Sequence, residues 1–171
     1  MIALRHHLPA SFGALVAACA MTAAPAALAA SPAKDAGHDH HAAAPARLAL
    51  DHGRQWGTDQ PLRAGMERLR ALVAGQLPAA HRGTLAPADY AAVAAKVENE
   101  VAGIVANCKL EPRADAMLHL VIADLAGGAD AMAGKTAGAK PEQGLVQVAT
   151  AVNNYGRYFR HPGFKPIRLD H

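Results

Sequence analysis

The chain has 171 residues, of which 51% are hydrophobic, 18% charged and 4% aromatic, and its formal net charge is +3. Alanine supplies 43 of these residues, which favours closely packed helices over a β-sandwich because alanine has the highest helix propensity and strands need β-branched and aromatic side chains. Two cysteines exclude a disulfide scaffold, and scattered basic residues argue against a nucleic-acid partner.

Residues 1–29 have the features of a cleaved export signal. Arg5 supplies the positive charge, an apolar stretch follows, and Ala27-Leu28-Ala29 matches an A-x-A cleavage pattern. Pro9 and Pro25 interrupt the stretch, which disfavours a membrane-spanning helix. We therefore expect a periplasmic or secreted protein, whose mature chain has a net charge of +2 because only Arg5 is lost.

The two cysteines raise separate questions. Val16-Ala17-Ala18-Cys19 fits a lipobox, so the alternative to signal removal is lipidation of Cys19, which would anchor the protein to a membrane. In either case Cys108 has no disulfide partner within the folded chain. We expect Cys108 to be a buried small residue, with a metal ligand or an intermolecular disulfide as alternatives.

A histidine cluster lies in the segment that follows the signal. Residues 30–55 have few bulky apolar side chains and are expected to be disordered. Within them, His38, Asp39, His40 and His41 place three imidazoles and a carboxylate in four consecutive positions. These ligands suit copper or zinc, and His-rich tracts are typical of metal binding. A solvated linker without a ligand is the alternative.

Residues 56–171 are expected to form one folded domain, with the ring of Trp56 packed against its end. The first helix is predicted over about 59–77, with Thr58 or Asp59 as N-cap, a proline in the first turn and Pro78 as its stop. Apolar residues recur along it at helical spacing, namely Leu62, Met66, Leu69, Val73 and Leu77.

Three more helices are predicted, over 87–107, 112–133 and 141–159. The pair Gly127-Gly128 in the third indicates either a bend or the close approach of a neighbouring backbone. The apolar stripes of these helices are, in order, Tyr90, Val93, Val97, Val101, Ile104 and Cys108; Met117, Leu118, Val121, Ile122, Leu125 and Met132; and Leu145, Val148, Val152, Tyr155 and Phe159.

Similar helix lengths and short connections predict an all-α, up-down-up-down antiparallel four-helix bundle. Residues 163–171 are expected to form an extended strap on the bundle end. Within the bundle, helical geometry places His119 at the flank of the third helix, beside Asp115 one turn earlier. A metal site made by Cys108 and His119 is an alternative to the His-rich segment. The sequence contains no catalytic motif, so we do not expect an enzyme.

The segment Leu62-Arg63-Ala64-Gly65-Met66-Glu67-Arg68-Leu69, together with the four exported helices, resembles the small periplasmic b-type cytochromes of the four-helix-bundle kind over about residues 57–160. The resemblance implies a non-covalent haem b, with Met66 as an axial ligand. That family carries its axial histidine late in the fourth helix, but residues 153–159 contain no histidine. His161, just beyond, is the nearest counterpart.

Three hypotheses follow. The first is an exported, non-enzymatic binding protein that takes up copper or zinc through the His-rich segment. The second is an electron-transfer protein that holds haem between Met66 and His161. The third is a structural or chaperone-like module that binds a periplasmic protein partner through a face of the bundle.

Overall fold

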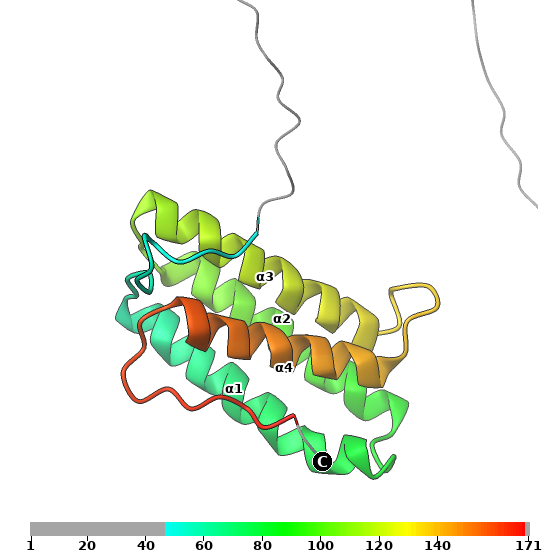
Figure 1. Cartoon of the computed structure of the whole chain (residues 1–171). Helices are drawn as coiled ribbons and strands as arrows, with labels where there is room; N and C mark the ends of the chain where they lie inside the picture. The colour runs from blue at the N-terminus through cyan, green and yellow to red at the C-terminus, as the bar shows by residue number, and fades with distance from the viewer. Residues whose placement is uncertain (1–46, 170–171) are drawn as a thin grey trace, which may run out of the picture. The chain divides into compact units, whose positions relative to one another are not determined.

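The computed structural model describes residues 47–169, and within them four helices pack together. The helices are α1 (Gln60–His81), α2 (Pro87–Asn107), α3 (Pro112–Met132) and α4 (Pro141–Tyr158). Each helix packs against the next along the chain, and α1 also packs against α4. In Figure 1 the chain runs from left to right along α1 and α3 and in the opposite sense along α2 and α4. The predicted all-α four-helix fold class is confirmed.

Every helix has a proline in its first turn, where the missing N–H group costs no intrahelical hydrogen bond. The start of α1 is also capped by Asp59, whose Oδ1 accepts a hydrogen bond from the backbone N–H of Leu62 at 3.0 Å. The second oxygen of Asp59 accepts from the N–H of Lys109 at 2.6 Å. One carboxylate therefore joins the start of α1 to the connection between α2 and α3.

The expected stop at Pro78 is wrong, because α1 continues to His81. Pro78 lies in the last turn, so its missing N–H removes one bond near the end of the helix, and the alanines after it favour helix. The helix ends where Gly83 adopts a positive φ of 64°. The backbone N–H of Thr84 then bonds to the Ala79 carbonyl at 3.0 Å.

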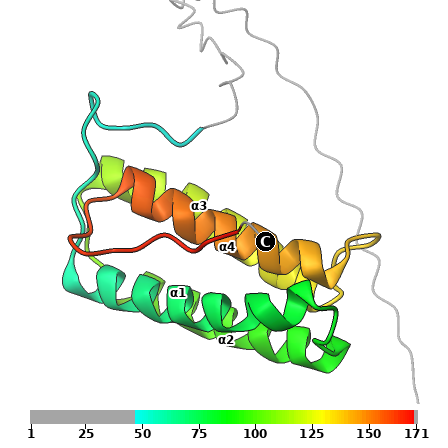
Figure 2. The same cartoon turned by 60° about the horizontal axis from the view of Figure 1, so that its bottom comes forward.

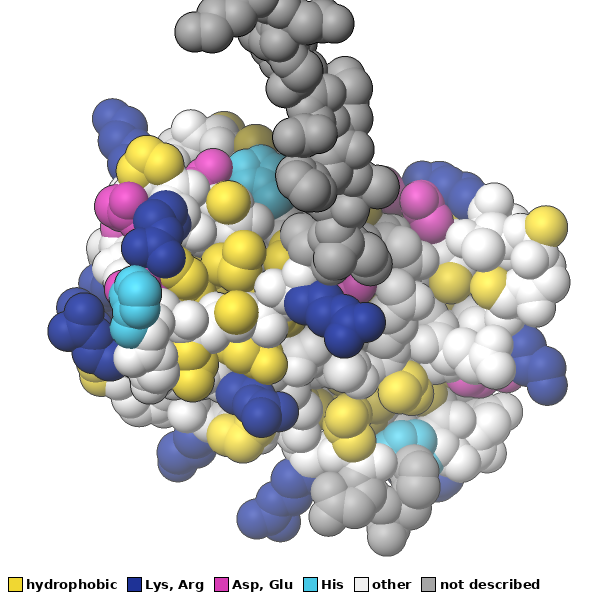
Figure 3. Space-filling view, turned by 45° about the horizontal axis from the view of Figure 1, so that its top comes forward, with side chains coloured by type: hydrophobic (Ala, Val, Ile, Leu, Met, Phe, Trp, Pro, Cys, Tyr) yellow, Lys and Arg dark blue, Asp and Glu magenta, His cyan; other side chains and the backbone are white. Residues whose placement is uncertain are grey.

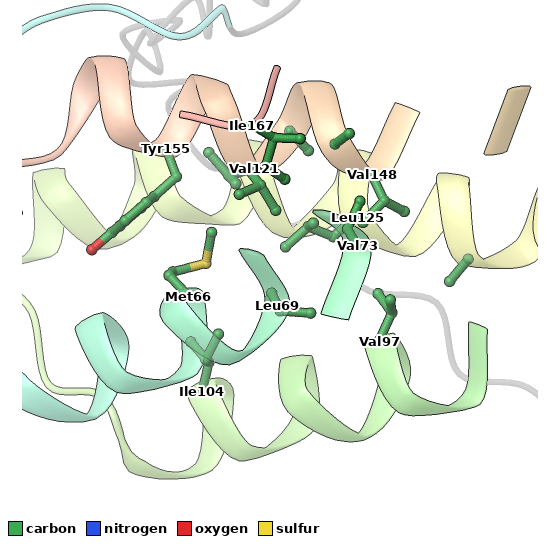
Figure 4. Close-up of a cluster of buried hydrophobic side chains, with 14 of the residues drawn as sticks. Met66, Leu69, Val73, Val97, Ile104, Val121, Leu125, Val148, Tyr155 and Ile167 are labelled. Atoms are coloured by element: carbon green, nitrogen blue, oxygen red, sulfur yellow. The ribbon is translucent and has the colours of Figure 1, made fainter. Parts of the chain in front are cut away.

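The predicted apolar stripes form a single core. All five stripe residues of α1 are buried, as are the four of α4 and its C-cap Phe159, and no polar or charged residue is buried among the described residues. Figure 4 shows how side chains from all four helices meet there, with Met66 of α1 and Tyr155 of α4 in the same part of the core. Some predicted core positions are only partly buried and lie at its margin, namely Val101, Cys108, Met117 and Ile122.

The two glycines in α3 mark a close approach and not the end of a helix. A Cβ on Gly128 would lie 2.8 Å from the carbonyl oxygen of Gly144 and 3.0 Å from the backbone nitrogen of Val148, both in α4. The same atom on Gly127 would meet only the side chain of Gln147. Of the two explanations for the glycine pair, the structure thus supports close approach, and it assigns that role to Gly128.

Residues 47–59 cross one end of the bundle before α1 begins. Trp56 is 6% exposed, its backbone N–H bonds to the Tyr158 carbonyl at 2.9 Å, and its indole N–H bonds to Ala49. The guanidinium of Arg113 lies over its ring. The expected packing of Trp56 is confirmed. The predicted disordered segment was too long at its C-terminal end, because Leu48 already packs against the core.

The C-terminal segment runs along the side of the bundle and not across its end as expected. Figures 1 and 2 both show this segment between α1 and α4. The Asn153 side chain of α4 accepts from the Ile167 N–H at 2.7 Å and donates to the Ile167 carbonyl at 2.9 Å. Ile167 is 6% exposed and is part of the core. The segment therefore fills the groove between the first and last helices.

Replacing Asn153 with alanine should release this segment. Loss of the side-chain amide leaves the backbone groups of Ile167 without their partners, and we expect the free energy of unfolding to fall by about 1–3 kcal/mol. Asn154, which is half-buried, is the matched control, and its replacement by alanine should cost about 0.5 kcal/mol or less. Urea unfolding measures both changes. Unchanged hydrogen exchange at the Ile167 amide in the Asn153 variant would contradict the assignment.

Candidate functional site

The residues predicted to bind metal most tightly lie outside the described part of the chain. His38, Asp39, His40 and His41 precede residue 47, as do the predicted signal and Cys19. The structure therefore bears on the bundle candidates alone. None of the helices in residues 47–169 is long and apolar enough to cross a membrane.

Cys108 lies at the end of α2 and His119 on the exposed side of α3, and Asp115 is close to both. His119 is exposed on α3, and its Nδ1 lies 2.9 Å from the Asp115 carbonyl oxygen and 3.4 Å from the Asp115 carboxylate, as its flank position predicted. Cys108 is the C-cap of α2. Burial, with the Asp59 and Asp115 carboxylates, raises the pKa of its thiol. Among residues 47–169, no three His, Cys, Asp or Glu side chains are grouped to hold one metal ion.

Met66 and His161, the residues suggested by the cytochrome resemblance, both lie near Tyr155. Met66 is 0% exposed within the apolar core, and Figure 4 shows its thioether between α1 and α4. His161 follows the end of α4, and its Nδ1 lies 3.0 Å from the Tyr155 hydroxyl. The Met66 side chain thus serves in packing, and one ring nitrogen of His161 is already engaged.

His161 belongs to a line of polar groups at this end of the bundle. Its Nε2 lies 3.8 Å from Oε1 of Glu67, whose other oxygen accepts from Arg70 Nε at 2.8 Å. Burial raises the pKa of Tyr155, so its hydroxyl, which is hydrogen-bonded to His161, stays protonated. Burial lowers the pKa of His161 and Glu67 opposes this shift only in part, so the imidazole is neutral at neutral pH.

A cavity of about 430 Å³ opens beside His161, lined by Thr58, Arg63, Arg160, His161 and Pro162. Its volume falls within the range of roughly 300–1,000 Å³ that small-molecule sites occupy. Two arginines and a neutral histidine line it, without a carboxylate. At neutral pH the lining therefore carries net positive charge, supplied by the two guanidinium groups.

Thr58 joins the two arginine-bearing segments. Its hydroxyl donates to the Arg160 carbonyl at 2.7 Å and accepts from Nη1 of Arg63 at 3.0 Å. Nη1 of Arg63 also donates to the Thr58 carbonyl at 2.9 Å. The backbone N–H of Arg160 bonds to Trp56 at 2.9 Å. These bonds fix the position of both segments before any ligand arrives.

A second cavity of about 490 Å³ lies on the other side of Thr58, and it differs in charge. Its lining includes Asp51, Glu111 and Arg113, and Nη1 of Arg113 lies 3.5 Å from the Asp51 carboxylate. Acidic and basic side chains thus offset one another there. The cavity beside His161 is the more distinctive of the two.

Of the residues that line the cavity beside His161, only His161 was predicted to be a site residue. Neither Arg63 nor Arg160 was among the predicted site residues. The one available signal was the basic run Arg157, Arg160 and His161 at the end of the fourth helix. Nothing in the sequence indicated that this run would meet Thr58 and Arg63, about a hundred residues earlier.

On the face drawn in Figure 3, lysine and arginine side chains are separated by apolar and neutral ones. Among residues 47–169, the large hydrophobic side chains that are exposed are far apart in sequence, namely Leu50, Val105 and Val146. No protein-family model matches the chain, and no curated protein or solved structure matches it.

Proposed function

We propose that this is an exported, non-enzymatic binding protein that takes up copper or zinc through its His-rich segment, with the helical bundle as the folded body to which that segment is attached. The observation that carries the proposal is ligand density. His38, Asp39, His40 and His41 supply three imidazoles and a carboxylate within four residues. Neutral imidazole is a ligand suited to both ions.

The contacts of the bundle candidates support this choice of site. Nδ1 of His119 already lies 2.9 Å from a carbonyl oxygen, and the Cys108 thiol is held in its protonated form by its raised pKa. A metal ion needs the thiolate and a free imidazole nitrogen. Nε2 of His119 stays open to a metal ion, but the Cys108 thiol would have to lose its proton, and no three such side chains are grouped around one position among residues 47–169, so a lower affinity is expected in the bundle.

Replacing His38, His40 and His41 together with alanine should abolish tight binding of Cu²⁺ and Zn²⁺. Calorimetric titration of the exported chain measures the loss. Affinity of the unaltered protein should fall steeply below about pH 6, because the ligands must be neutral and histidine has an ordinary pKa of about 6.5.

His119→Ala is the matched control, since it removes one exposed imidazole from the bundle. Its affinity for both ions should equal that of the unaltered chain. If the control loses affinity while the triple variant retains it, the site lies in the bundle and the proposal is wrong. If the unaltered chain binds neither ion, the histidine segment is a solvated linker.

The haem hypothesis is separated from this one by an absorption spectrum. In the bundle, Met66 is enclosed by the core and Nδ1 of His161 is bonded to Tyr155, so ligation by both residues would require repacking. We expect protein isolated after export to lack a Soret band. A Soret band that disappears in Met66→Leu or His161→Ala would favour haem binding instead.

A further inference from the structure

We propose that the cavity lined by Thr58, Arg63, Arg160 and His161 binds a small molecule carrying a phosphate group. This proposal is independent of the metal-binding function, because it rests on other residues and another part of the chain. It follows from the charge of the lining, the donors that remain open and the contacts that hold them.

The lining of this cavity is positively charged. Two guanidinium groups line the cavity without a carboxylate. Among the acids near by, Glu67 is paired through Oε2 with Arg70, whereas Asp59 accepts only backbone N–H groups and keeps its charge. An anion entering the cavity would thus meet positive charge that no neighbouring carboxylate fully offsets.

The two guanidinium groups keep N–H donors that an anion could use. Nη1 of Arg63 donates both its hydrogens to Thr58, but Nε and Nη2 have no partner among residues 47–169. No ion pair joins the guanidinium of Arg160 to a carboxylate in that part of the chain, although Asp51 lines a neighbouring cavity with Arg160. Guanidinium groups present planar pairs of N–H donors that match the oxygens of a phosphate. The cavity therefore offers two such groups to one anion.

Hydrogen bonds hold the backbone segments that carry the two arginines in place. Thr58 is a positioning residue, because its hydroxyl bonds to Arg63 and to the Arg160 backbone at the same time. Trp56 holds the Arg160 backbone from the other side. The arginine-bearing backbones are fixed before binding, so less ordering is required when the anion arrives. Isolated surface arginines lack such an arrangement.

The test is an NMR titration of the full exported chain with inorganic phosphate, against sodium chloride of equal ionic strength. Phosphate should shift the resonances of Arg63 Nε and of the Thr58 and His161 amides more than chloride does. Arg160→Gln should weaken phosphate binding by about tenfold, as expected for one charged hydrogen-bond donor. Arg63→Gln should do the same, and circular dichroism checks that its helices are retained.

Arg82→Gln is the matched control, because it removes one positive charge from an exposed residue at the other end of α1. It should change phosphate affinity by less than about twofold. Equal losses in Arg160→Gln and Arg82→Gln, or equal shifts with chloride, would overturn the proposal. Titration with glycerol phosphate identifies the source: tighter binding than inorganic phosphate indicates an organic ester, and weaker binding indicates the free ion.

Discussion

Replacing Val97 with aspartate is expected to unfold the helical bundle. Val97 is 0% exposed in the middle of α2, among aliphatic side chains from the other helices. A carboxylate there has no charged or hydrogen-bonding partner, and such burial costs several kcal/mol, a large part of the roughly 5–15 kcal/mol that stabilises a typical domain. Loss of the helical circular dichroism signal at room temperature is the expected measurement.

Lys96→Asp is the matched control, since it places the same residue one position away on the exposed face of α2. We expect it to change the free energy of unfolding by about 0.5 kcal/mol or less, as at most surface positions. Similar destabilisation by both substitutions would contradict the burial assigned to α2.

Replacing Gly128 with alanine should destabilise the bundle by about 2 kcal/mol or more, although alanine favours helix by about 1 kcal/mol over glycine. The added Cβ would lie 2.6 Å from a methyl group of Val148 and 2.8 Å from the Gly144 carbonyl oxygen. The carbonyl belongs to the backbone of α4, so α3 and α4 must move apart to accommodate it. Chemical denaturation measures the loss.

Gly127→Ala provides a sharp comparison, because the two glycines are adjacent. Its added Cβ would meet the Gln147 amide at 2.9 Å, and that flexible side-chain end can move aside. We therefore expect Gly127→Ala to be neutral or to stabilise the protein by up to about 1 kcal/mol. If Gly127→Ala proves the more damaging substitution, the packing of α3 on α4 differs from that described.

The helices could be predicted from sequence because their signals are local. Each helix has a proline in its first turn. The apolar residues of α1 recur at helical spacing and are buried as predicted. The predicted end of the first helix at Pro78 was wrong, because a proline interrupts a helix in its interior but is tolerated near its end. In the last turn, the loss of one N–H bond does not stop α1 from reaching His81.

The cavity beside His161 could not be predicted for a different reason. Thr58 and Arg160 are joined by a hydrogen bond across about a hundred residues, and no periodicity in the sequence reports such a pairing. The path of the C-terminal segment has the same origin. Ile167 packs into the groove between α1 and α4, where its backbone meets Asn153. That groove exists only once the helices are assembled, so no local pattern in the sequence reports it.

The two hydrogen bonds between the Asn153 side chain and the Ile167 backbone also affect how the protein folds. Because Ile167 is part of the core, the groove between α1 and α4 is filled only once the C-terminal segment has packed into it. Likewise, the hydrogen bond from the Trp56 N–H to the Tyr158 carbonyl can form only when the two ends of the described domain meet. Completion of the native state thus depends on contacts between residues about a hundred positions apart, and contacts of such long sequence separation slow folding.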